Sequence, residues 1–519
     1  MYDGSYVRTK KLTYFQPSNN PLSPVIKVQV TPQFLLLSAS PSRGRMGVVE
    51  NLQDYLRWPS WALQSVFILF SGICLLFVLE YQFASNGEGK NKERKDEKER
   101  RTLQQYNRQH QSTADASSFR WFQVQYLTVY LLIMLADWLQ GTNMYTLYAS
   151  YNVDIGLLFI TGFLSSAIFG TFLGVYVDKW GRRFGCILFC VLEIIINLLE
   201  HVPNMPLLLL GRVLGGISTS LLFSTFESWM VSEHRKRGFS EESLSDTFGI
   251  ASWSNGIVAI TAGFVAQASC DLSGDIGPFQ VAIALTAVTL LLILFWPENY
   301  GRSHDNVSNI LSEIQTAMTV IVKSPGMLCL GLSQAFYEGA VYTFVFLWVP
   351  TLLTVGTPSG NLPTGLVFSC FMLAMTIGGK LFSLLLPIFP GEAEGLCVLV
   401  YMLSSCAMMV PVFYFEFWPV FTAFLVLEGS LGMFNSCGGT LRSRYFPGSM
   451  QSSIMSVFRL PLNLLVVSGT KLSSVASSNV TDIKFVFAVI VGMHIVAMVF
   501  HCLLMLSGDR PPHNKLKVK

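Results

Sequence analysis

Charged side chains interrupt several long apolar stretches of this chain, and their chemistry needs an explanation. Arg459 lies in "SVFRLPLNLL", two residues before Pro461, and a proline inside a helix frees backbone groups and bends the helix. The planar guanidinium of arginine suits bidentate hydrogen bonds to an oxyanion. We therefore take Arg459 as the first candidate ligand for an anionic solute. The alternative is a structural ion pair with Glu338 or Glu428.

Acidic side chains in similar surroundings are candidates for carrying a proton, because an acid away from water holds its proton more tightly. They are Asp137, Glu193, Glu338 and Glu428. Asp137, in "ADWLQG", is the strongest candidate for a coupling proton. The alternative for Asp137 is an ion pair with a cation that holds two helices together.

Polar and aromatic residues in the same stretches could donate hydrogen bonds to an anion, although each is also an ordinary packing residue. Trp253-Ser-Asn255 roughly mirrors Phe458-Arg459 in position, so these two pairs are expected to face each other across a cavity. The candidate donors are Gln140, Asn143, Trp253, Asn255, Tyr337 and Asn463.

The elements that carry these residues are membrane helices. Of the 519 residues, 51% are hydrophobic and 13% charged, whereas soluble domains are about a quarter charged. A helix needs roughly 20 apolar residues to cross a bilayer, and thirteen runs between 61–83 and 482–507 are of that kind. Because a spanning backbone must satisfy its own hydrogen bonds, we expect an all-α membrane protein.

One run stands apart from the other twelve. A charge-dense segment follows it, and a longer loop at 298–326 divides the twelve into two groups of six, as in transporters built from parallel repeats. Met46 is a possible alternative start. The expected parts are an extramembrane, disordered extension (1–60), an extra helix (61–84), a charged linker (85–118), an N-terminal six-helix half (119–297), a central cytosolic loop (298–326), a C-terminal six-helix half (327–507) and a basic cytosolic tail (508–519).

The distribution of Lys and Arg predicts the orientation in the membrane. Basic residues gather at 179–183, 234–238 and 298–326, whereas the alternate loops carry acids such as Asp154 and Asp271. The positive-inside rule then places both ends of the twelve-helix block in the cytosol. Asn479-Val-Thr481 falls on the other side, where Asn479 is a candidate glycosylation site.

Several functional classes find no support in the sequence. The net charge of +3 is too small to suggest a nucleic-acid partner. The 10 Cys lie almost entirely in apolar runs, where cysteine serves as a small hydrophobe, so we expect no metal site and no cofactor. Nucleophile-elbow and phosphate-loop motifs are missing from the sequence. An enzyme or an ATP-driven pump is therefore not expected.

A short charged loop carries the first resemblance to a known family. Gly174, Asp178, Gly181, Arg182 and Arg183 have the spacing G-x3-D-x2-G-R-R between the second and third helices of the block. This pattern resembles the signature loop of the major facilitator superfamily.

The resemblance to that superfamily implies a gating motif, in which the arginine pairs with an acid at the cytosolic end of the fourth helix, here Glu227. It also links Arg212 to coupling or gating. Charges paired in a low dielectric can stabilise one of two conformations. The alternative is a plain positive-inside loop.

A closer resemblance covers most of residues 119–475. "ADWLQG" (136–141), "VDKWGRR" (177–183), "GRVLGGISTSLLFSTFESW" (211–229), Trp348-Val-Pro350 and "FRLPLN" (458–463) together are similar to the molybdate-anion transporter family. The longer basic linker and the 45-residue leader depart from that pattern.

The family resemblance implies high-affinity uptake of molybdate, a tetrahedral dianion, by a multi-pass membrane carrier that works by alternating access. The sequence shows no retrieval or organellar address, so we expect the plasma membrane. A co-transported proton would offset the charge of the dianion and is the second expected partner, beside the lipid bilayer. The alternatives are another oxyanion, a sugar, or a receptor or scaffold on the same fold.

Overall fold

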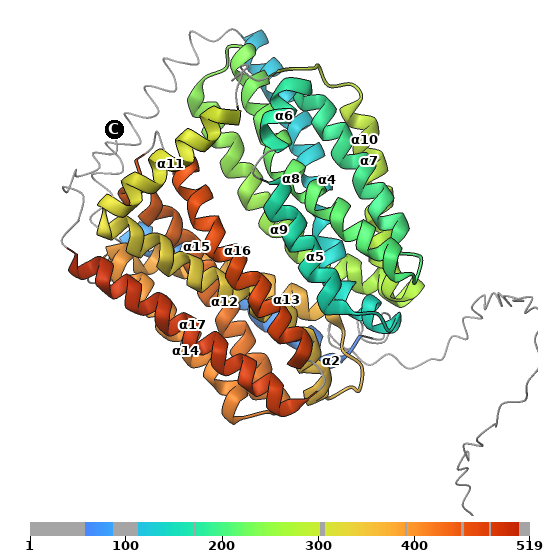
Figure 1. The fold of residues 1–519 in the computed structure, drawn as a ribbon, viewed down its shortest axis with the longest axis vertical. Coiled ribbons are helices and arrows are strands. Elements are labelled where there is room, and N and C mark those ends of the chain that lie inside the picture. Colours follow the sequence, from blue (N-terminus) through green and yellow to red (C-terminus); the bar gives the residue numbers. More distant parts are fainter. Residues whose placement is uncertain are drawn as a thin grey trace, which may run out of the picture. The chain divides into compact units, whose positions relative to one another are not determined.

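Helices joined by short connections follow one another along the chain in the computed structural model (Figure 1). The structure describes residues 58–86, 113–170, 173–300, 307–389, 392–447, 451–476 and 479–507. Met46, nearly all of the predicted extension 1–60, most of the linker 85–118 and the tail 508–519 lie outside the described residues.

The first group of helices follows the linker, and within it α8 packs against α5 and α7, while α4 packs against α9 and α10. Helices α5 and α6 together occupy one predicted apolar run, 155–178. The group consists of α4 (Thr113–Ser150), α5 (Ile155–Phe169), α6 (Leu173–Trp180), α7 (Arg182–Leu199), α8 (Met205–Lys236), α9 (Glu241–Ser273), the 3-10 turn η1 (Gly274–Ile276) and α10 (Gly277–Ile293).

The second group has the same number of membrane helices as the first. Helix α12 packs against α16 and α17, and α15 packs against α13 and α14. The group consists of α12 (Pro325–Val355), α13 (Thr364–Leu385), α14 (Glu392–Phe413), α15 (Phe417–Tyr445), α16 (Gln451–Ala476) and α17 (Val480–Leu506).

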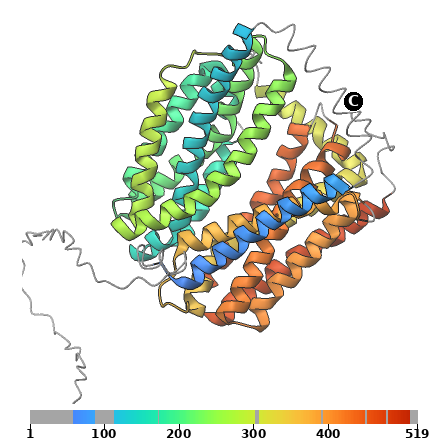
Figure 2. The same ribbon diagram turned by 180° about the vertical axis from the view of Figure 1, so that it is seen from behind.

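Two further helices stand outside both groups. Helix α2 (Ser60–Asn86) is the extra N-terminal helix, and it packs along α13, as the view from behind shows (Figure 2). Helix α11 (Val307–Lys323) occupies most of the stretch expected to be a loop. It buries Ala317 and Ile321 against the second group, because apolar residues recur there at helical spacing.

Local signals explain where several helices begin and end. Asp154 Oδ1 accepts a hydrogen bond from Leu157 N at 2.9 Å at the start of α5. Ser240 caps α9 through Ser243 N at 3.3 Å. Such side chains satisfy backbone donors that have no partner within the helix. Gly356 ends α12 with φ of 78°, a conformation that favours glycine.

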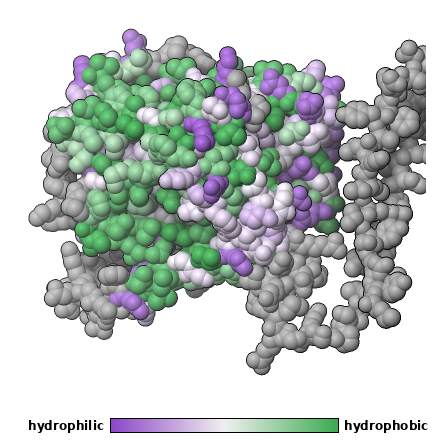
Figure 3. Space-filling model, turned by 90° about the horizontal axis from the view of Figure 1, so that it is seen from below, coloured by the Kyte–Doolittle hydropathy of each residue, from purple (hydrophilic) through white to green (hydrophobic). Residues whose placement is uncertain are grey.

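The helices have the length and composition that a bilayer requires. Within the described residues, nine helical segments are long and apolar enough to span a membrane, and one of them, Glu241–Ile293, joins α9 and α10. The face in Figure 3 is largely hydrophobic (green), with hydrophilic side chains gathered toward its centre and right edge. The chain is a multi-pass, all-α membrane protein with twelve membrane helices and one extra.

The two groups meet mainly through α5 with α16 and through α9 with α13. Gly156 lies so close to Ser474, and Gly263 so close to Ser369, that neither glycine has room for a Cβ atom. Ser369 also donates a hydrogen bond to the Ile260 carbonyl at 2.9 Å. We call the end of the bundle that includes Asp154 and Ser474 the acidic end and the opposite end, where α6, α8 and α15 finish, the basic end.

Candidate functional site: a cavity between the two helix groups

A cavity of about 740 Å³ lies between α5 and α8 of the first group and α12 and α16 of the second. Toward the acidic end it is bounded by an aromatic seal, in which Phe159 and Phe346 have ring centroids 4.7 Å apart and Phe163 lies 5.3 Å from Phe346. The cavity therefore lies on the basic-end side of the seal. The polar residues that line it are Ser166, Thr219, Ser220, Ser224, Gln334, Glu338, Tyr342, Ser456, Arg459 and Asn463.

Two predicted ligands on α16 line this cavity together. Arg459 is exposed, and Asn463, one helical turn later, lies on the same face because residues four apart are neighbours on a helix. Pro461 lies between them inside the helix. Arg459 and Glu338 are the basic and the acidic residue, respectively, among the described residues that line the cavity.

Sequence reasoning missed a polar stripe on α12. Gln334, Glu338 and Tyr342 follow one another at intervals of four, and all three line the cavity. Only Glu338 was singled out from the sequence. The interval was the available signal, since it aligns side chains on one face of a helix.

Hydroxyl groups from α8 form part of the opposite wall. Thr219 and Ser220 donate hydrogen bonds of 2.9 and 2.8 Å to the carbonyls of Gly215 and Gly216, one turn earlier. Rotation about the C–O bond would turn such hydroxyls into donors toward the cavity.

The other predicted hydrogen-bond donors are placed elsewhere. Tyr337 is fully buried, and its hydroxyl lies 3.1 Å from Ser404 Oγ. Gln140 donates to Glu193 at 3.0 Å, and Asn143 donates to Asp275 at 3.2 Å. The structure therefore gives these three side chains partners inside their own helix groups and away from the cavity wall.

Trp253 and Asn255 were expected to face Phe458 and Arg459 across the cavity, but they are not among the described residues that line it. Asn255 Oδ1 accepts a hydrogen bond from Trp138 Nε1 at 3.0 Å, and Trp253 is 65% exposed on α9. Of the mirrored residues, Phe458 and Arg459 line the cavity.

The acids of the first group form a polar network. Glu193 accepts hydrogen bonds from Gln140 at 3.0 Å and from Ser218 at 2.6 Å. Asp137, which is exposed, lies within electrostatic range of Glu193. In the second group, Glu428 is buried beside Tyr337.

Arg212 has an ion-pair partner near the acidic end that was not among the predicted site residues. Its guanidinium forms an ion pair with Glu200, whose side chain is 1% exposed. Tyr148 donates a hydrogen bond to the same carboxylate at 2.8 Å. Glu200 follows directly after α7, and the short connection to α8 brings it back against Arg212.

The predicted gating motif begins α7. Gly181 has φ of 114°, and a Cβ atom there would lie 2.7 Å from the Glu298 side chain, so only glycine fits. The Glu298 carboxylate accepts hydrogen bonds from the backbone N–H groups of Arg183 at 2.8 Å and Phe184 at 3.1 Å. Glu298 was not anticipated; an acid soon after the apolar run 277–297 was its signal.

The Arg183 side chain of this motif bonds to the end of a helix. The Arg183 guanidinium donates to the carbonyls of Ile293 and Leu294, at 3.3 and 2.6 Å, where α10 ends. Glu227 is exposed on α8, within electrostatic range of Tyr130. The surroundings of Gly174 and the side chain of Asp178 lie outside what the structure describes.

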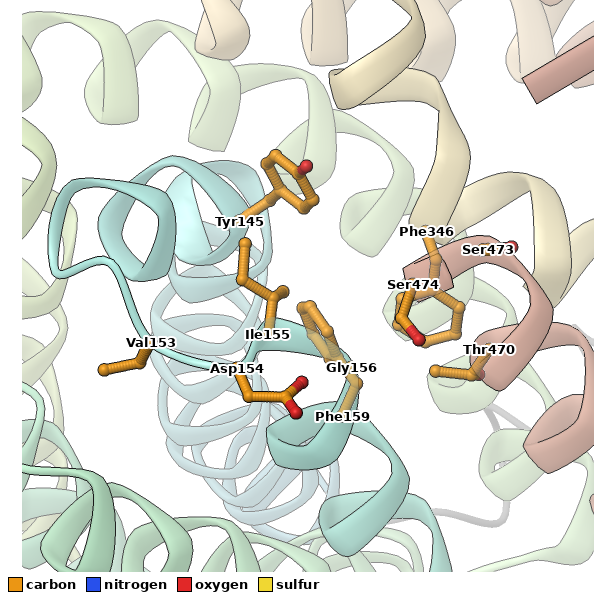
Figure 4. A pocket seen from close by; sticks show the side chains of 10 residues that line it. All are labelled: Tyr145, Val153, Asp154, Ile155, Gly156, Phe159, Phe346, Thr470, Ser473 and Ser474. Atoms are coloured by element: carbon orange, nitrogen blue, oxygen red, sulfur yellow. The ribbon is translucent and has the colours of Figure 1, made fainter. Parts of the chain in front are cut away.

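A second, smaller cavity of about 230 Å³ lies at the acidic end, beside the seal. Residues of α4, α5 and the loop that joins them line one part of the wall, and residues of α12 and α16 line the rest (Figure 4). Asp154 is the one charged residue among those described in its wall. A negatively charged wall without a cation does not suit an anion.

Asn479, the candidate glycosylation site, is exposed at the start of α17. Its Oδ1 caps the helix by accepting a hydrogen bond from Thr481 N at 3.2 Å.

Known proteins are similar to this chain in sequence and in architecture. Residues 100–434 match the family model described as "Sugar transporters, 12 TM". The chain is 33% identical over 372 residues to a molybdate-anion transporter of Xenopus tropicalis, an alignment that covers 68% of this chain and 79% of that protein.

Two solved structures are similar in fold. The nucleoside transporter NupG gives a TM-score of 0.57 at 14% identity, covering 74% of this chain and 99% of that chain. A bacterial homologue of the human lysosomal transporter Spinster, solved in an inward-facing and unoccupied conformation, gives a TM-score of 0.58 at 14% identity, covering 76% and 98%.

Proposed function

Because this chain belongs to the molybdate-anion transporter family of the major facilitator superfamily, we propose that it takes up molybdate with high affinity by alternating access. The chain is a membrane transporter and not an enzyme. In our proposal the anion binds in the cavity between the two helix groups.

The observation that carries this proposal is the exposed guanidinium of Arg459 inside that cavity. Molybdate is a dianion with four oxygens, so it requires a cation and several hydrogen-bond donors. Arg459 supplies the charge and a bidentate fork. Asn463 and Gln334 supply amide donors, and Tyr342 supplies a hydroxyl.

Alternating access is supported by the unequal ends of the bundle. The aromatic seal and the close glycine contacts join the groups at the acidic end, whereas the cavity separates them toward the basic end. If the basic end faces the cytosol, this is the inward-facing conformation. In our proposal the gating motif Gly174–Arg183, together with Glu227, would then hold the helices that move at that end.

A coupled proton would offset the charge of the entering dianion. Asp137 and Glu193 lie within electrostatic range of each other, and two neighbouring carboxylates readily share one proton. Asp137 is accordingly our coupling residue in the first group, with Glu338 and Glu428 the corresponding acids of the second. Arg212, already paired with Glu200, has a structural part in this scheme.

The test is uptake of radiolabelled molybdate, at nanomolar concentration, by cells that lack their own transporter. The wild-type protein should accumulate molybdate, and Arg459→Ala should reduce uptake by about tenfold or more, the loss expected for a charged hydrogen bond. Arg235→Ala is the matched control, since Arg235 forms an exposed ion pair with Glu241. Surface expression is measured for each variant.

The competing functions predict other outcomes. An excess of sulfate that abolishes uptake would indicate a broader oxyanion carrier. Uptake of a labelled sugar, unaffected by Arg459→Ala, would overturn the anion proposal. A receptor or scaffold would reach the surface and transport neither solute.

We place the protein in the plasma membrane and propose that Asn479 carries a glycan on the exoplasmic side. Asn479→Gln should abolish any mobility shift on treatment with an endoglycosidase, and surface biotinylation should label the protein. A protein confined to internal membranes would contradict the proposed location.

A further inference from the structure

We propose that Arg442 is the second cation of the anion site and a positioning residue for Gln334, so that Arg442, Glu338 and Arg459 set the charge of the cavity together. This inference rests on the proposed function, because it assigns residues to the same anion site. Arg442 and Arg444 are both in the last turn of α15.

The two neighbouring arginines at the end of α15 have different surroundings. Arg444 forms ion pairs with Glu392 at 2.8 Å and Glu394 at 3.3 Å, at the start of α14. Arg442 Nη1 donates a hydrogen bond to Gln334 Oε1 at 3.1 Å. Both arginines are half-buried, but Arg444 pairs with acids of α14 whereas Arg442 contacts an amide of α12.

A glycine makes room for Arg442. A Cβ atom at Gly438, one turn before Arg442 on α15, would lie 3.2 Å from Arg442 Nη1 and 3.4 Å from Gln334 Nε2. These are tighter contacts than side chains ordinarily make. Gly438 thus allows the guanidinium and the amide to pack against α15 side by side.

Arg442 determines which end of the Gln334 amide is available. Because the guanidinium has only donors, the Oε1 atom of Gln334 must face it, which leaves the NH₂ group for other acceptors. Gln334 Nε2 lies a long 3.5 Å from the Gly438 carbonyl, and the amide has a second hydrogen. Since Gln334 lines the cavity, Arg442 turns it into a donor for a bound oxyanion.

Glu338 is the acid that interacts with both cations. It is within electrostatic range of both Arg442 and Arg459, yet among the described residues it forms no ion pair with either guanidinium. Tyr342 of α12 is also near it. With Glu338 ionised the three side chains carry a net charge of about +1, and loss of the Arg442 charge brings it to about zero.

The experiment measures the KM and the maximal rate of molybdate uptake, with surface expression as a reference. Arg442→Gln removes one charge and should raise the KM about tenfold while changing the maximal rate little. Arg444→Gln, the matched control two residues away, should leave the KM unchanged. The double variant Arg442→Gln with Glu338→Gln restores the net charge and should recover most of the affinity.

These outcomes separate the inference from the proposed function. A structural role of Arg442 predicts that Glu338→Gln gives no recovery, and an unchanged KM for Arg442→Gln overturns the inference while leaving the function intact. If the wild type fails to transport molybdate, the proposed function itself fails. If Arg442→Gln does not reach the surface, Arg442→Lys is used instead, because lysine keeps the charge but not the planar fork of donors. A KM close to that of the wild type then supports the charge assignment. A KM as high as that of Arg459→Ala contradicts it.

Discussion

Neighbouring residues in this chain often have opposite environments, and sequence alone separates them poorly. Tyr337 and Glu338 differ by one position, yet the first is fully buried against Ser404 and the second lines the cavity. Successive helix positions point about 100° apart, so the choice depends on how the helix is rotated against its neighbours. The apolar composition of both helix faces conceals that rotation.

Charge placement could be predicted in part. Arg459 and Asn463 follow from their spacing on one helix, and the structure puts both in the cavity wall. The partner of Arg212 could not be anticipated, because Glu200 is brought to it by the turn between α7 and α8. From sequence alone, a charged residue near the end of a helix is predicted to be exposed to solvent, because its tertiary contacts are not known.

The Arg212–Glu200 pair predicts a large effect on stability. Arg212→Ala should lower the free energy of unfolding by about 3 kcal/mol, since it leaves a buried carboxylate without its cation. The measurement is denaturant unfolding in detergent, with Arg235→Ala as the control. Arg235 and its partner are largely exposed, so that variant should match the wild type. An Arg212→Ala protein as stable as the wild type would show that the pair contributes nothing.

At the scale of elements, the extra helix α2 links the two groups beside their contact at the acidic end. Trp58, just before α2, donates a hydrogen bond of 2.7 Å to Asp271 at the end of α9. The rest of the helix follows α13, and Lys380 of α13 pairs with Glu80 at 2.8 Å. Helix α2 thus packs against the second group, and Trp58 just before it contacts the first group.

Removing the Trp58 donor should weaken closure at the acidic end. The background is a variant with Cys74, Cys406 and Cys502 replaced by serine and with Ser474→Cys as the reporter for an impermeant maleimide. In this background, Trp58→Phe should increase the rate of labelling by up to about tenfold. That factor corresponds to the free energy of one hydrogen bond to a carboxylate. Trp61→Phe is the matched control, because Trp61 bonds to Ser359 within the second group. Equal rates for both variants would contradict this role of Trp58.

At the scale of the whole molecule, the number of helices was predictable but their relative closure was not. Apolar runs of membrane length, divided by the longer loop in the middle of the chain, indicate two helix groups plus one helix. The end at which the two groups close depends on contacts such as that of Gly156 with Ser474. A carrier must form both closures from one sequence, so composition cannot favour either. Helix α11 was expected as a loop because polar and apolar residues are interspersed along it, and its exposed side carries Gln315 and Thr319 as well as Met318 and Val322.

A side chain at Gly156 should prevent closure at the acidic end and shift the population toward the opposite conformation. Gly156→Val should slow labelling of Leu460→Cys, which lines the cavity, by a reagent applied from the basic end, and should also reduce transport. Gly256→Val is the matched control, because a Cβ atom at Gly256 meets no other atom within 4 Å. It reports the effect of placing valine in a helix without a steric clash. Labelling at the wild-type rate would mean that this contact does not govern closure.

The aromatic seal has an electrical consequence. The rings of Phe159, Phe163 and Phe346 offer no polar path between the cavity and the acidic end, and apolar constrictions exclude water and ions. Most of the transmembrane voltage should therefore fall across this thin layer. Arg459 and Glu338 would sit close to the potential of the solution at the basic end, so voltage would act on the closing of the rings more than on solute occupancy.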